Sequence, residues 1–284
     1  MTTAICAFMK RENAYIDEWL KHHISIGIDK IILFDNNDNM EDYPMTEFVS
    51  RQIILKRVKV INKRNTKLNK DKELKIVYNA CKTDWICFID IDEFIYIRDG
   101  KSIKEALSNS LYENVQNVLM PSIVFGDGNN IYYDDNHSVK ERFSKMCIRN
   151  NKYTKICKAF IKTKISSYTS LSSNGIIYPG VKSISSSGTS LNPKTPYINW
   201  NDICPIEIHA YPTKSLEEYC MVKVSRNKKY DNNKIEEYKD KYFSVNERTA
   251  DKEALFDLFI NKAYDSDESN SGMHSYAEFN IGNG

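Results

Sequence analysis

The chain has 284 residues, with 40 Lys and Arg against 38 Asp and Glu, so its formal net charge at pH 7 is +2. This near balance argues against a protein that binds nucleic acid through bulk charge, because such domains are strongly basic. Hydrophobic residues make up 41% of the chain and aromatic residues 12%, which is enough for a packed core and argues against general disorder.

The sequence also bears on location. Its apolar runs are shorter than the roughly 20 residues of a membrane-spanning helix, and its first residues do not have the pattern of a signal peptide. The seven cysteines are scattered, which is typical of reduced thiols rather than of disulfides or a zinc site. We therefore expect a cytoplasmic protein, with the inner face of the cell membrane as a site of peripheral contact.

The first half alternates between strand-like and helix-like segments. Thr3–Met9 is a short apolar run, and apolar residues then recur at helical spacing from Ile16 to Ile24, before Gly27. The other elements predicted here are strands at residues 30–36, 52–60 and 85–94 and a helix at 70–81. This order predicts an α/β fold with a mostly parallel sheet flanked by helices, in which ligands bind beyond the carboxyl ends of the strands.

The second half is less regular. Strands are predicted at residues 117–126, 158–164 and 206–212, and helices after Thr213 or Ser215 and at 247–263. Residues 166–190 are rich in Ser and Gly, which predicts long loops, either a mobile lid or an inert insertion. We expect one main domain over residues 1–230 and a C-terminal helical extension with a polar tail over 231–284.

Two aspartates form the strongest local signal. Asp90 and Asp92 follow a buried run that begins at Trp85, and they precede Glu93. In a continuous strand both aspartates would point to one face, where burial is costly unless a cation compensates their charge. Mn²⁺ or Mg²⁺ would compensate it and would bind the diphosphate of a nucleotide. The alternative is that these acids only end the strand and cap the following turn.

Other candidate residues lie at strand ends or within strands. Lys10 and Arg11 could contact phosphates, and Glu12 could accept a hydrogen bond from a ribose or base; helix initiation is the alternative. Asp35 and Asn36 close the second strand, where turn chemistry alone explains them equally well.

His209 lies in an apolar strand and is either a metal ligand or a satisfied core residue, whereas we expect the pair His22 and His23 to serve packing or the surface. The one local excess of basic residues runs from Lys56 to Lys75. Such a stretch is usually a solvated surface; contact with donor phosphates or with an anionic membrane is the alternative.

Four motifs, in order, resemble the pattern of glycosyltransferase family 92 and its bacterial relatives. The first two comprise Lys10–Glu12, Glu18–Trp19, His22 or His23, Gly27 and Phe34–Asn36, and then Trp85, Phe88, Asp90 and Asp92–Phe94. The third and fourth comprise Phe125–Gly128 with Glu141–Phe143, and His209, Tyr211, Lys214–Ser215, Glu217–Tyr219, Lys223 and Arg226. Arg11 and Asn227 replace the Asn and Gly that are usual in the family.

The resemblance implies the GT-A glycosyltransferase fold and the inverting transfer of a hexose from a nucleotide sugar, in particular a UDP-hexose such as UDP-galactose. It implies that Asp90, Asp92 and His209 hold Mn²⁺ or Mg²⁺ and that Asp35, Asn36 and Lys10–Glu12 face the nucleotide. An inverting reaction needs a carboxylate base; Glu141 is the first candidate and Asp127 the second, while an ion pair with Arg142 or a nearby Lys is the alternative role for Glu141.

The acceptor implied is a glycan or glycolipid, in the synthesis of a surface polysaccharide or lipooligosaccharide. Two other classes of function are the alternatives. A phosphatase or nucleotidyltransferase also uses paired carboxylates, but the phosphatase type usually carries them on the first strand. A non-catalytic carbohydrate-binding protein has no need of paired acids and a later histidine.

Overall fold

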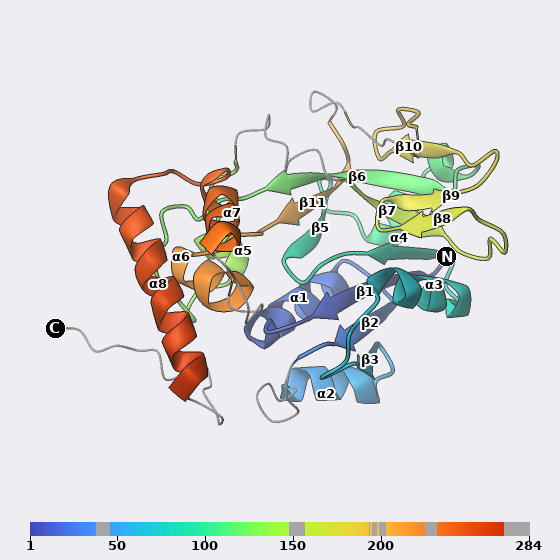
Figure 1. The fold of residues 1–284 in the computed structure, drawn as a ribbon. Helices are drawn as coiled ribbons and strands as arrows, with labels where there is room; N and C mark the ends of the chain where they lie inside the picture. Colours follow the sequence, from blue (N-terminus) through green and yellow to red (C-terminus); the bar gives the residue numbers. More distant parts are fainter. Residues whose placement is uncertain are drawn as a thin grey trace.

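The computed structural model describes residues 1–37, 46–147, 157–192, 194, 198, 203–224 and 232–269 (Figure 1). Its strands are β1 (Thr3–Met9), β2 (Lys30–Asp35), β3 (Val58–Asn62), β4 (Trp85–Phe88), β5 (Glu93–Ile97), β6 (Asn117–Val124), β7 (Cys157–Lys162), β8 (Ser170–Ser172), β9 (Gly175–Ile177), β10 (Ser183–Ser185) and β11 (Ile206–Ala210). Its helices are α1 (Asn13–Ser25), α2 (Glu47–Ile54), α3 (Lys70–Ala80), α4 (Ile103–Leu107), α5 (Val139–Arg142), α6 (Leu216–Glu218), α7 (Asn232–Phe243) and α8 (Ala250–Ser269), with a 3-10 turn at Ser110–Tyr112 and a π-helix at Tyr219–Val224.

A nine-stranded sheet in the order β3-β2-β1-β4-β7-β6-β11-β5, with β10 beside β6, forms the centre of the molecule. Strands β1 to β4 pair in parallel, whereas β7 pairs antiparallel with β4 and β6, and β5 pairs antiparallel with β11. The predicted α/β fold with a mostly parallel sheet and flanking helices is therefore confirmed. Strands β6 and β11 point towards α6, α7 and α8 (Figure 1), and β1, β2 and β4 run in the same direction.

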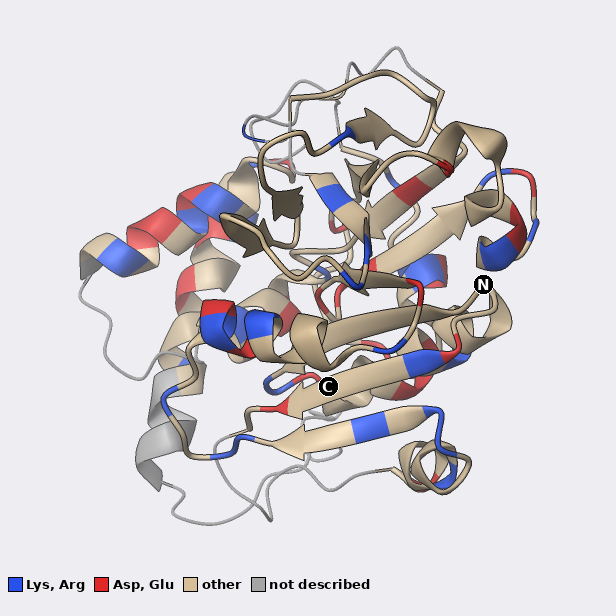
Figure 2. Cartoon of the chain, turned by 90° about the vertical axis from the view of Figure 1, so that its right-hand side faces the viewer, with Lys and Arg blue, Asp and Glu red and all other residues tan. Residues whose placement is uncertain are grey.

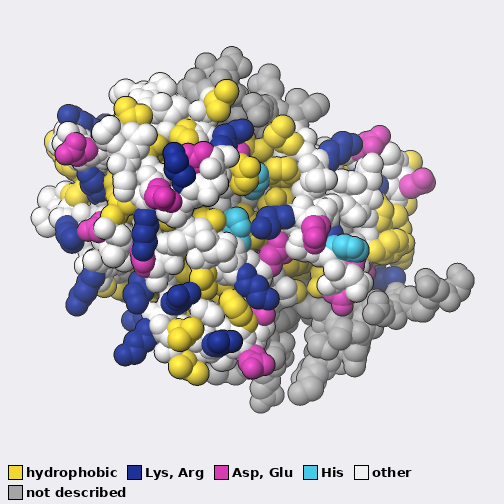
Figure 3. Space-filling model, turned by 180° about the vertical axis from the view of Figure 1, so that it is seen from behind, with side chains coloured by type: hydrophobic (Ala, Val, Ile, Leu, Met, Phe, Trp, Pro, Cys, Tyr) yellow, Lys and Arg dark blue, Asp and Glu magenta, His cyan; other side chains and the backbone are white. Residues whose placement is uncertain are grey.

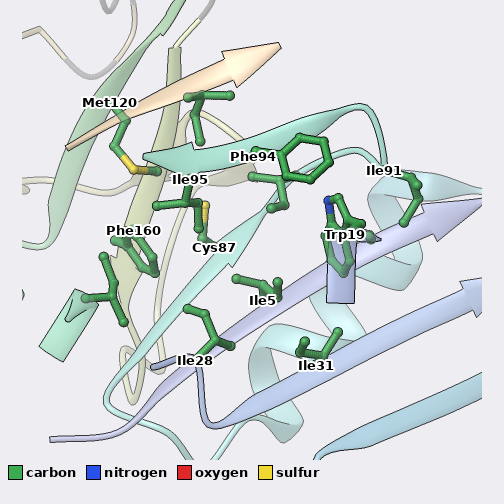
Figure 4. Packing of buried hydrophobic residues seen from close by; sticks show 14 of the residues in the cluster. Ile5, Trp19, Ile28, Ile31, Cys87, Ile91, Phe94, Ile95, Met120 and Phe160 are labelled. Atoms are coloured by element: carbon green, nitrogen blue, oxygen red, sulfur yellow. The ribbon is translucent and has the colours of Figure 1, made fainter. Parts of the chain in front are cut away.

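Two hydrophobic clusters cover the two faces of the sheet. On one face, α1, α2 and α4 bury Trp19, Val49 and Ile103 against β1, β2, β4 and β5, and Figure 4 shows Trp19 among core residues that include Ile5, Ile31 and Phe94. On the other face, α3 and the β8–β9 hairpin cover the sheet. The helical spacing of apolar residues in α1 and α3 thus places one side of each helix on the core, as predicted.

Two predicted strands were wrong in part. Residues 52–54 belong to the end of helix α2, which Thr46 caps at its start by accepting a hydrogen bond from the Val49 amide. Only residues 58–62 form the strand. The predicted strand 85–94 is divided into β4 and β5. A turn separates them, with the Glu93 amide donating to the Asp90 carbonyl at 3.1 Å. The two aspartates therefore lie in a turn and not along one continuous strand.

The later elements follow the prediction more loosely. The Ser-rich segment predicted as loops contains the short strands β8, β9 and β10. Helix α8 begins at Ala250 and runs to Ser269; the rest of the predicted polar tail lies outside the described residues. Helices α7 and α8 bury Tyr242 and Phe256 against Leu216 and Tyr219. The C-terminal helices therefore share a core with the segment before them, and the domain boundary at residue 230 stays a prediction.

The two histidines of α1 pack against β5, as expected. His23 is fully buried; its Nδ1 lies 2.8 Å from the Trp19 carbonyl, and its Nε2 accepts from the Ile95 amide. This pair of contacts requires a neutral ring, with the proton on Nδ1. Burial lowers the pKa of His22 to about 4 and the pKa of His23 well below its usual value. Nearby Lys140 acts in the same direction on both rings.

These lowered pKa values predict that acid destabilises the fold. Below about pH 6.5 the unfolded chain protonates both histidines while the folded chain leaves them neutral, so the free energy of unfolding falls as the pH falls, by up to about 1.4 kcal/mol per pH unit for each ring. Urea unfolding of the wild type and of His23→Gln between pH 7 and pH 4.5 measures this. We expect a shallower decline in the variant; equal slopes in the two proteins would contradict the assignment.

Candidate active site at the carboxyl ends of the parallel strands

The carboxyl ends of four neighbouring strands bring the predicted residues to one edge of the sheet. Strands β1, β2, β3 and β4 are parallel and in register along this edge, so the residues that follow Met9, Asp35, Asn62 and Phe88 lie together. Most of the length of the strands carries no charge, and the charged residues lie mainly on helices and connections (Figure 2). The connections at this edge include charged residues, among them Lys10, Arg11, Glu12, Arg64 and Asp90.

Asp35 is held rigidly at the end of β2. It is 4% exposed, and its Oδ2 lies 2.7 Å from Nε of Arg64, which follows β3. Its Oδ1 accepts from the side chain of Asn37 at 2.8 Å. Asn37 in turn accepts from the Arg11 amide at 2.6 Å, which ties the end of β2 to the start of α1.

The connection from β1 to α1 carries Lys10, Arg11 and Glu12. Arg11 adopts the left-handed backbone conformation, with φ of 53°, and Glu12 is 5% exposed. The Asn36 amide donates to the Met9 carbonyl at 2.9 Å. The structure thus gathers five residues predicted to face the nucleotide on two adjoining connections, and their contact with a nucleotide stays a prediction.

The first aspartate of the acidic turn belongs to a buried ion-pair cluster. Lys158 of β7 lies 3.0 Å from Asp90 Oδ2 and 3.0 Å from Glu93 Oε2, and its side chain is 8% exposed. Glu93 is buried as well, which raises its pKa to about 7, although the charge of Lys158 opposes this shift. The side chain of Asp90 remains 48% exposed, so one carboxylate faces solvent above a buried pair.

The second aspartate faces the late segment of the chain. Asp92 is 8% exposed, and its Oδ2 lies 2.5 Å from Nζ of Lys223 in the π-helix. Its carbonyl accepts from the Tyr211 amide at 2.8 Å, directly after β11. The acidic turn and residues 211–224 therefore meet at one place, although more than a hundred residues separate them in sequence.

His209 occupies a different environment. Its Nε2 lies 3.0 Å from Glu207 Oε1, and its ring stacks on Tyr96 with centroids 4.4 Å apart. Within the described residues, no three His, Cys, Asp or Glu side chains are grouped closely enough to hold a metal ion. The structure therefore does not bring His209 together with Asp90 and Asp92, and its role as a metal ligand stays a prediction.

The two aspartates alone fit a hard divalent cation. Mg²⁺ and, by similar chemistry, Mn²⁺ are bound through one or two carboxylates, with water and substrate phosphates supplying the other oxygens. Asp90 is exposed enough to offer an oxygen, and Asp92 is paired with an ammonium group that a cation would replace. Chemically the acidic turn suits such an ion without a third protein ligand.

The two candidate bases differ in their surroundings. Glu141 caps α5: its Oε2 accepts from the Ser138 amide at 2.8 Å and the Ser138 hydroxyl at 2.7 Å, and these bonds lower its pKa. Asp127 is 3% exposed, and its Oδ2 accepts from Tyr242 Oη and Lys252 Nζ, each at 2.7 Å. Asp127 therefore joins the loop after β6 to the C-terminal helices, whereas Glu141 is open to solvent.

A buried ion pair links two of the sequence motifs. Arg142 donates two hydrogen bonds to Glu218, at 2.7 and 3.1 Å, and Glu218 also accepts from Tyr15 Oη at 2.6 Å. This parallel geometry is the strong form of the arginine–carboxylate pair. Arg142 is thus paired with Glu218 and not with its neighbour Glu141, which was the alternative role given to Glu141. The pair anchors α5 and α6 to the start of α1.

A groove of about 650 Å³ runs between α1 and residues 133–142. Tyr15 and Arg142 line it, and so do His22 and His137. Histidine side chains reach the surface among acidic and basic ones on the face shown in Figure 3. Because Tyr15 and Arg142 also bind Glu218, this groove adjoins the segment that contacts Asp92.

Three lysines near the acidic turn were not predicted as functional residues. Lys158 is the second residue of strand β7, where no motif marks it. Lys214 and Lys223 belong to the fourth motif of the family pattern, which was a usable signal.

The basic stretch Lys56–Lys75 contributes two ion pairs. Lys63 is paired with Glu73 at 2.7 Å, and Arg64 is paired with Asp35. A membrane contact of this stretch stays a prediction. The part of the chain that the structure describes contains no helix long and apolar enough to cross a bilayer.

Comparisons with known proteins agree with the family resemblance. A sequence profile of glycosyltransferase family 92 matches residues 2–241. Family 92 proteins from Ricinus communis and Oryza sativa subsp. japonica are each 24% identical to the chain, over 109 and 111 residues. Each match covers 37% of this chain and 19% or 18% of the relative, so the aligned part is about a fifth of the relatives' length.

Several solved structures align with the chain over most of its length. S. aureus TarS 1–349 aligns over 95% of this chain and 74% of its own, with 11% identity and a TM-score of 0.39. The mannosyltransferase PcManGT of Pyrobaculum calidifontis, in complex with GDP-Man and Mn²⁺, aligns over 95% and 76%, with 9% identity and a TM-score of 0.34. Since the family profile covers most of the sequence, the chain belongs to glycosyltransferase family 92.

Proposed function

We propose that this chain transfers a hexose from a nucleotide sugar, a UDP-hexose such as UDP-galactose, to a glycan or glycolipid acceptor in surface polysaccharide or lipooligosaccharide synthesis. Membership of family 92 supports the class of reaction. The observation that carries the proposal is the position of Asp90 and Asp92, in a turn at the carboxyl ends of parallel strands. Ligands of α/β sheets bind at this edge.

The donor is proposed to lie across the ends of β1, β2 and β4. Asp35, fixed by Arg64, and Asn36 would face the nucleoside, and Lys10–Glu12 would border it. Asp90 and Asp92 would hold Mn²⁺ or Mg²⁺. When bound, such an ion neutralises charge on the diphosphate.

Inversion requires the acceptor hydroxyl to attack from the side opposite the diphosphate. The acceptor oxygen then forms a bond to the anomeric carbon as the bond to the diphosphate oxygen breaks; the electron pair stays on the diphosphate, and the proton of the hydroxyl passes to a carboxylate base. We propose Glu141 as this base, because it is exposed and stands between Lys140 and Arg142, which line the groove between α1 and residues 133–142. We propose that the acceptor enters this groove.

Incubation of the protein with UDP-hexoses and Mn²⁺ tests the function directly. We expect release of UDP in the wild type and its loss in Asp92→Asn, because the variant weakens binding of the cation. Asp99→Asn, which changes an exposed aspartate paired with Lys101, is the control and should keep full turnover. UDP release that is equal in wild type and Asp92→Asn would overturn the role of the acidic turn.

The same assay decides the place of His209. If His209 binds the metal, His209→Ala raises the Mn²⁺ concentration needed for half-maximal turnover. If His209 only pairs with Glu207, His209→Ala leaves that concentration unchanged.

The base has a matched control within the chain. Glu141→Gln should lower turnover by about 10²–10⁴-fold while leaving the donor's affinity unchanged, because the amide cannot accept the proton. Glu105 forms the same capping box with Ser102 on α4 and is equally exposed, so Glu105→Gln reproduces the change in capping. Turnover that falls equally in both variants, or in neither, would exclude Glu141 as the base.

A further inference from the structure

Lys214 is a buried lysine next to the acidic turn. It is 5% exposed, and it adopts the left-handed backbone conformation with φ of 54°, which is unfavourable for a residue with a side chain. It lies between β11 and the cap residue Ser215 of α6. The fold thus holds this lysine in a costly conformation at the place where residues 211–224 meet Asp92.

The ammonium group of Lys214 is poorly compensated. In the described part of the chain its one direct partner is the ring of Tyr15, whose centroid lies 4.2 Å from Nζ. Burial lowers the pKa of Lys214, and the charges of Asp92 and Glu12 oppose this shift. A ring face attracts a cation but does not accept its three N–H donors. A largely buried ammonium group is costly unless oxygen acceptors satisfy it, so a ligand that brings oxygen acceptors to Lys214 is favoured.

Lys223 is a second lysine close enough to act on Lys214, and it is partly exposed. Its Nζ contacts Asp92 Oδ2 at 2.5 Å, and the side chains of Lys223 and Asp92 are 23% and 12% exposed. Lys223 lies on the π-helix Tyr219–Val224, a geometry often found at functional sites. Of the two other acids that act on Lys214, Glu12 and Glu218, Glu218 is paired with Arg142. Two ammonium groups therefore lie beside Asp92, and one of them is accessible from solvent.

We propose that Lys214 and Lys223 bind the diphosphate group of the donor nucleotide beside Asp92, which names the phosphate-binding residues of the proposed function and rests on it. The phosphate oxygens supply the acceptors that Lys214 lacks. Lys223 moves from the carboxylate to the phosphates, which leaves Asp92 available to a divalent cation. Both ammonium groups then face the negative charge that collects on the leaving diphosphate.

Calorimetric titration of the full chain with inorganic pyrophosphate, in EDTA, tests this without the metal and without turnover. We expect measurable binding to the wild type and a loss of affinity of at least about tenfold in Lys214→Met and in Lys223→Met, because each variant removes one charged donor. Lys101→Met removes an exposed lysine paired with Asp99 and should bind as the wild type does. Thermal unfolding of Lys214→Met should show no loss of stability, since Met fills the site without a buried charge.

The outcomes separate this inference from the proposed function. Pyrophosphate that does not bind the wild type, or that binds both lysine variants with unchanged affinity, overturns the inference. Lys223→Arg, which keeps the charge, should restore most of the affinity; no recovery over Lys223→Met would count against a direct phosphate contact. Lysine-dependent pyrophosphate binding supports the inference even if no nucleotide sugar is consumed, a result that would overturn the proposed function alone.

Discussion

The hydrogen bond from the Tyr211 amide to the Asp92 carbonyl, 2.8 Å long, continues the ladder between β11 and β5 into the acidic turn. Strand β5 reverses direction after β4, and its pairing with β11 brings a segment from late in the sequence to the carboxyl edge of the parallel strands. This pairing brings Lys223 into contact with Asp92 and Lys214 into its neighbourhood. The proposed site therefore depends on a contact between the two halves of the chain.

Charge at this edge is balanced locally. Lys158 compensates Asp90 and Glu93, while Lys223 compensates Asp92. Lys158 is thus shared by two acids and Lys223 pairs with one, and a ligand or a divalent ion can replace these cations. Except for Asp90, these groups have low solvent exposure, where charges interact strongly. The net charge of +2 is consistent with this arrangement, since it excludes a protein built to bind a polyanion but not one that binds a single diphosphate.

The sequence predicted the parallel half of the fold well, because helical spacing in α1 and α3 and short apolar runs are strong signals. It placed Asp35, Asn36 and the Lys10–Glu12 connection at one edge, where the structure has them. It failed where short apolar runs are ambiguous: residues 52–54 are helical under the Thr46 cap, and the run from Trp85 is broken by a turn.

The side-chain partners were beyond the reach of local patterns. The contacts of Asp92 with Lys223 and of Arg142 with Glu218 join residues 131 and 76 positions apart, and only the order of strands in the sheet determines them. Asp127, the second candidate base, shows the same limit: no local pattern predicted the contacts of its carboxylate with Tyr242 and Lys252.

A crystal structure of the full chain with UDP and Mn²⁺ tests the central claim most directly. The account predicts a diphosphate between the Asp90–Asp92 turn and the side chains of Lys214 and Lys223, with Lys223 withdrawn from Asp92. A diphosphate bound elsewhere, for instance in the groove between α1 and residues 133–142, with the contact between Lys223 and Asp92 intact, would contradict it.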